Sequence, residues 1–386
     1  MSRVPLQELL DLSDSGVWGD EDTENGVSVL RSTNFKANGT LDFTKLTFRV
    51  IEERKCAAKI LQEGDILLEK SGGGPMQPVG RVCLYRGHSL QHSFGNFIAR
   101  LRPKADILSE FLFYFLWHFH ATGKTSHYQK QTTGIRNLEY KRFLTIEVPV
   151  PSLDEQRRIV DILSRAEGIV RLRREAEKKA AELIPALFID LFGDPATNPK
   201  GWPASLFGAV GVLDRGRSRN RPRDAKELYG GPYPFIQTGD VANSGGRITG
   251  YTATYSEAGL AQSRLWKRGT LCITIAANIA KTGVLEFDAC FPDSVVGFLP
   301  NEQVRTAYVQ AWLGFLQPTL EATAPQAAQK NINLEILRNL PIPLPPLALQ
   351  ELFEQRCSDV ISIQSQQSAA TAKAQATFDA LLAQVF

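Results

Sequence analysis

The chain has 386 residues, 43% of them hydrophobic and 22% charged, which is typical of a globular protein long enough for two or three domains. Its formal net charge of +3 is too small to indicate a partner, so a surface for nucleic acid would have to come from a local basic cluster. The five cysteines form no C-x-x-C pair, the first residues contain no apolar core of signal-peptide length, and the most apolar run, at 111–119, is too short to cross a bilayer, so we expect a soluble cytoplasmic protein without disulfides.

Residues 1–133 have the patterns of a small mixed α/β domain. Apolar or alternating runs predict strands at 27–30, 64–70, 80–87 and 93–101. Asn38 and Gly39 are typical of a hairpin turn, and a glycine run at 71–74 follows the second of these strands. Segment 109–119 predicts a helix with Ser109 as its N-cap.

Residues 134–192 are predicted to form a link and then a long helix. The P-V-P at 149–151 cannot continue a helix, so the link is extended there, and Ser152 with Glu155 forms a capping box before the helix. Along the helix a 3-4 spacing of mostly apolar residues predicts a coiled-coil seam. The predicted seam positions are Ile159, Ile162, Ala166, Ile169, Arg173, Ala176, Ala180, Leu183 and Leu187.

Residues 193–330 are predicted to form a second domain, and 331–386 a second link and long helix. Strand patterns lie at 233–250 and 267–287, and a helix is expected at 306–316, as in the first domain. The seam recurs 194 residues further along the chain. Its second copy is Phe353, Arg356, Val360, Ile363, Gln367, Ala370, Ala374, Thr377 and Leu381.

The links also repeat. N-L-E at 137–139 pairs with N-L-E at 333–335, and Gln156 pairs with Gln350. These matches predict a duplicated unit of domain and helix, and closure of a pseudo-dyad within one chain requires the two helices to run antiparallel. The central Arg173 and Gln367 either fix the register of the seam or are tolerated where the seam is wet.

Five arginines at alternate positions in D-R-G-R-S-R-N-R-P-R are the best candidates for DNA contacts. They are Arg215, Arg217, Arg219, Arg221 and Arg223, and the glycine and proline among them favour an extended loop. Arginine forks suit phosphates and guanine edges, and the alternative is a solvated loop without a ligand. In the first domain Lys70 and Arg81 flank the glycine run at 71–74, where backbone could approach a phosphate; the alternative is a plain flexible turn.

A Gln-Lys-(Gln/Asn) run precedes each link and supplies further candidates for DNA contacts or, alternatively, for helix capping. These candidates are Gln129, Lys130, Gln131 and the nearby Arg136 in the first half, and Gln329, Lys330 and Asn331 in the second. Segments 31–34 and 238–240 are expected at equivalent hairpins and are further candidates.

No catalytic signature is visible in the sequence. An N-P-P-[YFW] pocket and a glycine-rich methyl-donor loop are both missing, and Gly123-Lys124-Thr125 lacks the first glycine of a P-loop. The five histidines all lie between 88 and 127 and are expected at strand or helix surfaces rather than as metal ligands. We therefore expect a non-catalytic chain without cofactor or metal.

The chain resembles the DNA-specificity subunit of type I restriction–modification systems. The resemblance rests on I-R-N-L-E-Y-K-R-F-L-T-I-E-V-P-V-P-S-L-D-E-Q-R-R-I-V at 135–160, on its partner at 332–353 and on L-F-G-D-P-A-T-N-P-K-G-W-P at 191–203. It implies two α/β (α+β) target-recognition domains in tandem, separated by two long helices that form an intramolecular antiparallel coiled coil. It further implies that each domain reads half of a split double-stranded DNA sequence, that two modification (methyltransferase) subunits dock on the helices, and that restriction subunits join through the complex. The alternative is a coiled-coil scaffold without a DNA role.

Overall fold

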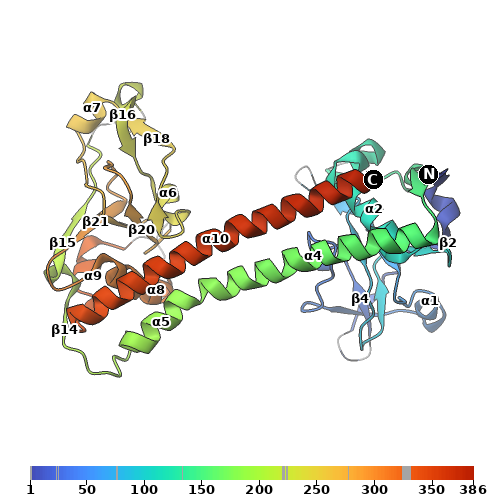
Figure 1. Ribbon diagram of the computed structural model, residues 1–386, viewed down its shortest axis with the longest axis horizontal. Helices are drawn as coiled ribbons and strands as arrows, with labels where there is room; N and C mark the ends of the chain where they lie inside the picture. The colour runs from blue at the N-terminus through green and yellow to red at the C-terminus, as the bar shows by residue number, and fades with distance from the viewer. Residues whose placement is uncertain are drawn as a thin grey trace. The chain divides into compact units, whose positions relative to one another are not determined.

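The computed structural model describes residues 2–22, 24, 26–74, 77–132, 134–219, 222, 225–276, 278–323 and 332–386. The chain divides into two compact units, Met1–Arg174 with Ala369–Phe386, and Glu175–Ser368 (Figure 1). In the part of the chain that is described, every helix is too short or too polar to span a membrane.

Two four-stranded sheets form the framework of the first unit. One has the order β2 (Leu10–Ser15), β10 (Ile98–Pro103), β6 (Ile66–Glu69), β8 (Val82–Leu84), all antiparallel. The other has the order β3 (Asp20–Glu21), β5 (Thr47–Val50), β4 (Val27–Leu30), β9 (His92–Phe94), with β4 and β9 parallel. Alternate residues of β6 enter two cores: Ile66 and Leu68 pack under helix α2 (Ser109–Ala121), whereas Leu67 packs with Leu30 and Phe94. The strand is therefore apolar from Ile66 to Leu68, and it ends in the buried Glu69.

Helix α2 confirms the predicted helix but not its predicted cap. Its N-cap is Leu108, so Ser109 is already the first helical residue. Phe111 to Leu116 are all buried, and Phe111 lies 5.5 Å from the ring of Phe386, beside the C-terminal end of α10 (Leu347–Val385) (Figure 1). The aromatic run is therefore core, as its length suggested.

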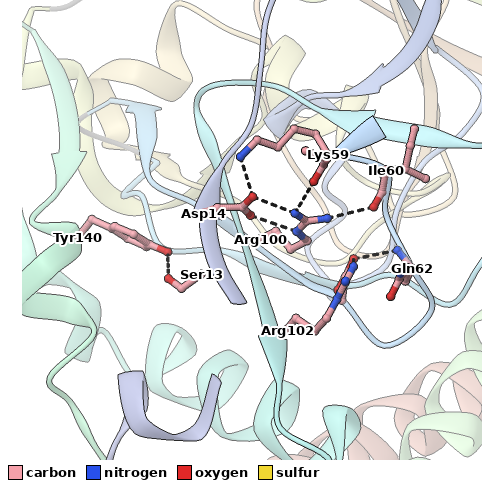
Figure 2. A network of polar contacts seen from close by, with 10 residues as sticks. Ser13, Asp14, Lys59, Ile60, Gln62, Arg100, Arg102 and Tyr140 are labelled. Atoms are coloured by element: carbon pink, nitrogen blue, oxygen red, sulfur yellow. Dashed lines mark hydrogen bonds and ion pairs between the residues drawn. The ribbon is translucent and has the colours of Figure 1, made fainter. Parts of the chain in front are cut away.

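Buried ion pairs and hydrogen bonds join strands β2 and β10 of the first sheet to segment 58–60, which precedes β6 (Figure 2). Arg100 is 1% exposed, and its Nε and Nη2 donate to the two carboxylate oxygens of Asp14 at 3.0 and 2.8 Å. The same guanidinium donates to the carbonyl oxygens of Ala58 and Ile60, and Lys59 adds a second cation 2.6 Å from Asp14. Every charge in the cluster is thus paired, which a buried arginine requires.

Smaller elements complete the first unit. They are β1 (Ser2–Pro5) paired with β13 (Glu147–Val150), a three-stranded sheet of β11 (Gln129–Thr132), β12 (Ile135–Leu138) and β7 (Ser71–Gly73), and the short helices η1 (Leu6–Leu9), α1 (Glu53–Ala57), η3 (Lys124–Tyr128) and α3 (Tyr140–Phe143). The glycine run expected to be a turn thus begins as strand β7.

The second unit repeats this plan. Its main sheet has the order β15 (Gly211–Arg215), β21 (Val295–Pro300), β19 (Leu271–Thr274), β20 (Thr282–Leu285), β17 (Arg247–Ile248). Around it lie β14 (Ala204–Leu206) paired with β22 (Pro341–Pro343), β16 (Tyr229–Phe235) paired with β18 (Ala253–Tyr255), and the helices η4 (Phe207–Ala209), η5 (Lys226–Leu228), α6 (Thr238–Ala242), α7 (Glu257–Ala261), α8 (Thr306–Thr323) and α9 (Leu334–Arg338). Helix α8 confirms the prediction at 306–316 and extends it.

Two buried glutamines show how closely the halves match. Gln156 Oε1 accepts from the Leu108 amide, and its Nε2 donates to the carbonyl oxygens of Asp106 and Pro151. Gln350 makes the same three bonds, to the Arg305 amide and the carbonyl oxygens of Gln303 and Pro345. The predicted pairing of Gln156 with Gln350 is confirmed, and each glutamine ties the start of a long helix to the loop before α2 or α8.

The predicted long helices are present, with one interruption. The first is α4 (Leu153–Ala181), and Glu182 separates it from α5 (Leu183–Phe192), where Pro185 lies in the first turn and sacrifices no helical hydrogen bond. Ser152 Oγ accepts from the Glu155 amide at 3.4 Å, which is the N-cap half of the predicted capping box, and the Glu155 carboxylate pairs with Arg158. The second long helix is α10, which is continuous.

The helices pack antiparallel within each unit. In the first, Arg174 donates to Gln375. In the second, Gln364 donates to the carbonyl of Ala180, and Phe353 packs on Phe192 near the other end of the pairing. Rising residue numbers in one helix thus accompany falling numbers in the other.

The predicted seam is half wrong. Every seventh position is buried or half-buried as expected, namely Ile159, Ala166, Arg173, Ala180, Leu187, Phe353, Val360, Gln367, Ala374 and Leu381. The positions between them are shifted by one: Ile162, Ile169, Leu183 and Ile363 are 40–52% exposed, Ala176, Arg356 and Thr377 are also exposed, and Ala370 is only half-buried. The buried or half-buried neighbours are Leu163, Val170, Glu177, Ile184, Cys357, Gln364, Thr371 and Phe378.

The physical reason is that a 3-4 and a 4-3 spacing share every seventh residue. Apolar side chains occupy both alternatives at Ile162 and Leu163, and again at Ile169 and Val170. Only packing against the domain core distinguishes them, because Leu163 and Val170 join the core under α2.

Candidate nucleic-acid interface

Three segments meet at the end of the first strand of the main sheet in each unit, and we call this surface the loop face. In the first unit it consists of 16–18, 31–34 and 95–97, and in the second of 216–219, 237–240 and 292–294. The equivalence rests on matching backbone bonds: Gly16 and Val17 donate to Ile98 and Phe94. In the other half, Gly216 and Arg217 donate to Val295 and Phe291.

Glycine is required at the same point of both loop faces. A Cβ on Gly16 would lie 2.1 Å from the carbonyl oxygen of Phe94, and one on Gly216 would lie 2.2 Å from that of Phe291. The chain therefore passes equally close to the neighbouring loop in both halves.

The second segment of each loop face is a turn closed by a side chain. The amide of Arg31 donates to Asn34 Oδ1 at 2.9 Å, and the amide of Gln237 donates to Asp240 Oδ2 at 2.8 Å. The predicted equivalence of 31–34 and 238–240 is confirmed. The predicted hairpins are wrong, because the turns continue as the 3₁₀-helix η2 (Ser32–Asn34) and as α6.

The arginine cluster lies on the loop face of the second unit. Arg215 ends β15, and the chain is extended through 216–219, with Arg215, Arg217 and Arg219 exposed and the residues between them buried. Ser263 Oγ donates to the Arg217 carbonyl, and the Arg219 amide donates to Gln262 Oε1. The backbone is thus held while the guanidinium groups face solvent. Arg221 and Arg223 lie outside the described residues.

The candidate DNA-contact residues of the first unit lie close together, but several of them already make hydrogen bonds within the chain. Strands β11, β12 and β7 bring Gln129, Lys130, Gln131 and Arg136 beside the glycine run. Gln129 Nε2 donates to the Val79 carbonyl at 2.9 Å. Lys130 Nζ lies 2.5 Å from Glu139, whose pKa is lowered by hydrogen bonds from Lys130 and Arg142. Gln131 is exposed.

Lys70 and Arg81 hold the fold of the first unit. Arg81 makes four hydrogen bonds, two to the buried carboxylate of Glu69 and two to the carbonyl oxygens of Phe35 and Ser32. The bond to Glu69 raises the pKa of Arg81. Lys70 donates to Ser15 Oγ at 2.8 Å, and burial lowers the pKa of Lys70. Both cations are thus hydrogen-bonded within the first unit, and their proposed contacts to DNA stay a prediction. Gln329, Lys330 and Asn331 lie outside the described residues.

A cleft opens on the first loop face, and a second cleft meets the second loop face only at its 237–240 segment. The first has a volume of about 460 Å³ and is lined by Trp18, Arg31, Ser32, Thr33, Gly72, Gly95, Asn96, Phe97 and Ile98. The second has a volume of about 560 Å³ and is lined by residues between Gln237 and Thr252. Sequence patterns missed Trp18, Asn96 and Phe97 because single loop residues carry no periodic signal. An exposed aromatic side chain is recognisable only once burial is known.

Histidines and cysteines supply no metal centre in the described parts of the chain. His92 is buried, which contradicts the expected surface position; its Nδ1 lies 2.8 Å from Ser28 Oγ, and its ring stacks on Phe43. Burial lowers the pKa of His92 to about 4. The five cysteines are buried thiols, and burial raises their pKa values above the ordinary range.

Comparison with known proteins gives one consistent result. The family model for the type I restriction modification DNA specificity domain matches twice, at residues 13–182 and 204–370. A protein of Methanocaldococcus jannaschii that carries the name of type I restriction enzyme MjaX specificity subunit is 22% identical over an alignment 388 positions long, which covers 96% of this chain and 89% of that protein.

Two solved structures share the fold. A chain from a type I restriction–modification complex has a TM-score of 0.62 and 20% identity, and the match covers 99% of this chain and 96% of that one. The type I restriction–modification S subunit from M. genitalium has a TM-score of 0.57 and 14% identity, with 100% and 96% covered. With two family matches that together span most of its residues, the chain belongs to the family of type I restriction modification DNA specificity proteins.

Proposed function

We propose that this chain is the DNA-specificity subunit of a type I restriction–modification complex and that each loop face reads one half of a split DNA sequence. The observation that carries the proposal is the presence of two loop faces with one backbone framework and different side chains. A duplicated framework presents two readers, and different side chains let the two readers select different words. We take the recognition domains as residues 1–133 and 193–330, and the helical segments as 134–192 and 331–386.

The proposed contacts are sequence-dependent on the loop faces and electrostatic around them. Arg215, Arg217 and Arg219 are held on an anchored backbone with their charged ends in solvent. Arginine in this setting pairs with phosphates or with guanine O6 and N7. The chain itself is proposed to be non-catalytic and to work in the cytoplasm, so methylation and cleavage belong to partner subunits.

Modification subunits are proposed to dock on the helices. Ile162, Ile169 and Leu172 of α4 are 40%, 52% and 58% exposed, although large apolar side chains are usually buried. A row of exposed apolar residues at helical spacing suits a protein partner, with one modification subunit expected at each copy of the helical segment. Restriction subunits would join through these partners.

Methylome sequencing of a host that carries this chain with its modification subunit tests the proposal. The expected result is a motif of two short words separated by a fixed gap. A continuous motif would count against two readers, and a host in which no motif depends on this chain would support the coiled-coil scaffold instead. A host that carries the modification subunit alone is the control.

A further inference from the structure

We propose that the cleft on the first loop face reads purine edges in the major groove, with Arg31 and Asn96 as hydrogen-bonding residues and Trp18 and Phe97 as apolar walls. The proposal rests on the proposed function and adds the residues that fix one of the two words. The described side chains around this cleft carry four kinds of support.

The first support is an arginine with unused hydrogen-bonding capacity. Arg31 lines the cleft, and its Nε is buried without a hydrogen-bond partner among the described residues. A buried donor without a partner costs stability, so the residue gains when a ligand supplies an acceptor. The Arg31 backbone is fixed by the turn that Asn34 closes, and Asn34 in turn donates to the carbonyl oxygens of Asp42 and Lys45. The guanidinium therefore projects from a rigid base.

The second support is the pair of aromatic rings. Trp18 and Phe97 are 45% and 47% exposed although both are large and apolar. Arg49 lies over the Trp18 ring, with its Cζ 4.3 Å from the centroid, and Arg49 Nη2 is 3.4 Å from Glu21. The ring is thus held in place by a cation–π contact rather than left loose. A site for phosphate alone needs cations and amides, whereas exposed rings suit the apolar part of a base pair, such as the methyl group of the thymine that is paired with an adenine being read.

Two glycines form the third support, because they keep the cleft open. A Cβ on Gly72 would lie 3.2 Å from the Phe97 ring, and Gly72 has a φ of +95°. A Cβ on Gly95 would lie 3.6 Å from the Trp18 ring. Side chains at these positions would fill the space between the rings, which at about 460 Å³ is large enough for a base edge.

The fourth support is the comparison of the two halves. Backbone bonds place Trp18 opposite Ser218, Arg31 opposite Gln237 and Phe97 opposite Ser294. The side chains differ at every one of these points although the framework is shared. Such differences are expected of positions that read different words, and a general phosphate site would need the same charges in both halves.

The test is the methylome of a host with the complete complex in which Arg31→Lys or Asn96→Ala replaces the native residue. Lysine keeps the charge for a phosphate but loses the planar fork, so Arg31→Lys separates the two kinds of contact. We expect one word to become degenerate at one or two positions, with discrimination there falling about tenfold or more, while the other word and the gap stay unchanged.

Arg54→Ala is the matched control, because Arg54 is an exposed arginine of α1 that does not line the cleft. Unchanged words with a uniform loss of methylation would overturn the proposal in favour of a phosphate contact, and unchanged methylation would remove the cleft from recognition. Asn96 lies in an exposed loop, so Asn96→Ala keeps the test valid if Arg31→Lys fails to fold. If the native complex gives no split motif, the proposed function fails and not this cleft alone.

Discussion

Gln156 and Gln350 do the same work at the residue scale. Both are buried, and both use their amide nitrogen and oxygen to satisfy two backbone groups in the loop before a domain helix and one carbonyl group just before the long helix. An amide is suited to this because it donates and accepts from one flat group. The junction between domain and long helix thus depends on one side chain in each half.

Replacing Gln156 by Leu should lower the free energy of unfolding by about 1–3 kcal/mol, because it leaves the Leu108 amide and two carbonyl groups buried without partners. Urea denaturation measures the change. Gln355→Leu is the control, since Gln355 is an exposed residue of α10. Equal stabilities of the two variants would show that water replaces the lost bonds.

Two histidines make the first unit sensitive to acid. Burial, with a smaller effect from His88, lowers the pKa of His92 to about 4, and burial, with Arg81, lowers that of His120 to about 4. An unfolded histidine titrates near 6.5, so between about pH 6.5 and 4 the unfolded chain binds more protons than the folded chain. The free energy of unfolding should therefore fall as the pH drops through that window and stay unaffected by these groups above it.

Unfolding measured at a series of pH values should give a flatter curve for the double variant His92→Asn and His120→Asn. Asparagine keeps a hydrogen-bonding group beside Ser28 and Thr125 but does not titrate. His127→Asn is the control, because His127 is exposed. A double variant as acid-sensitive as the native chain would assign the effect to other groups.

The exposure of individual site residues could be predicted only where the same residue type recurs at regular spacing. Alternate arginines at 215–219 predicted an extended, exposed loop, and the structure confirms that conformation. Arg81 looked equally suitable from its neighbours, yet its charge is taken up by Glu69, which sequence spacing does not reveal. The cleft residues Trp18 and Phe97 are 79 positions apart, and only the sheet brings them together.

At the scale of elements, the long helices were predicted correctly in place and direction and incorrectly in phase. A test of the phase compares neighbours in α4. Leu163→Ala should lower the free energy of unfolding by about 2–5 kcal/mol, because Leu163 is fully buried in the core under α2.

Ile162→Ala should change the same free energy by less than about 1 kcal/mol, since Ile162 is 40% exposed. Ile162→Ala should instead weaken co-purification of the modification subunit. Leu163→Ala cannot test that docking by itself, because it also destabilises the core. Denaturation and pull-down of both variants measure the two effects. The reverse order of stabilities would restore the seam predicted from sequence.

Sheets were less predictable than helices because their order depends on distant pairing. Gly39 does occupy a tight turn, with a φ of +74° and bonding between Lys36 and Thr40. The parallel contact of β4 with β9, however, joins residues about sixty positions apart, and no local signal specifies it. Single strands such as β4 were therefore recoverable, but the strand predicted at 93–101 is two strands, β9 and β10, the segment 233–250 contains helix α6, and the sheet topology was not recoverable.

At the scale of the whole molecule, both halves have a main sheet, a domain helix and a long helix, whereas the strand numbers of the sheets and the residue spacing differ between the halves. Equivalent residues are Gly16 with Gly216, Phe94 with Phe291 and Gln156 with Gln350, so the offset changes from 200 to 197 to 194 along the chain. The N-L-E match is misleading for the same reason: Glu139 precedes α3 as its N-cap, and its counterpart before α9 is Asn333. Loops of different length change the offset between equivalent residue numbers, so equivalent residues can be identified only from matching backbone hydrogen bonds.

The last prediction concerns how the molecule holds DNA at a net charge of only +3. Binding that depends on a few exposed cations must be salt-dependent, with the logarithm of the association constant falling by about 0.9 per phosphate contact for each unit of log salt. Removing Arg217 and Arg219 together should therefore weaken DNA binding by the complex and reduce that slope by about 2 if both contact phosphates. The control is Lys267→Ala with Arg268→Ala, which removes the same charge from exposed side chains of the same unit that pair with Asp288 and Glu286. Binding titrations at several salt concentrations measure both. A slope that falls equally in the two variants would mean that total charge, and not the loop face, sets the affinity; an unchanged slope with a changed methylation motif would mean that these arginines contact bases instead.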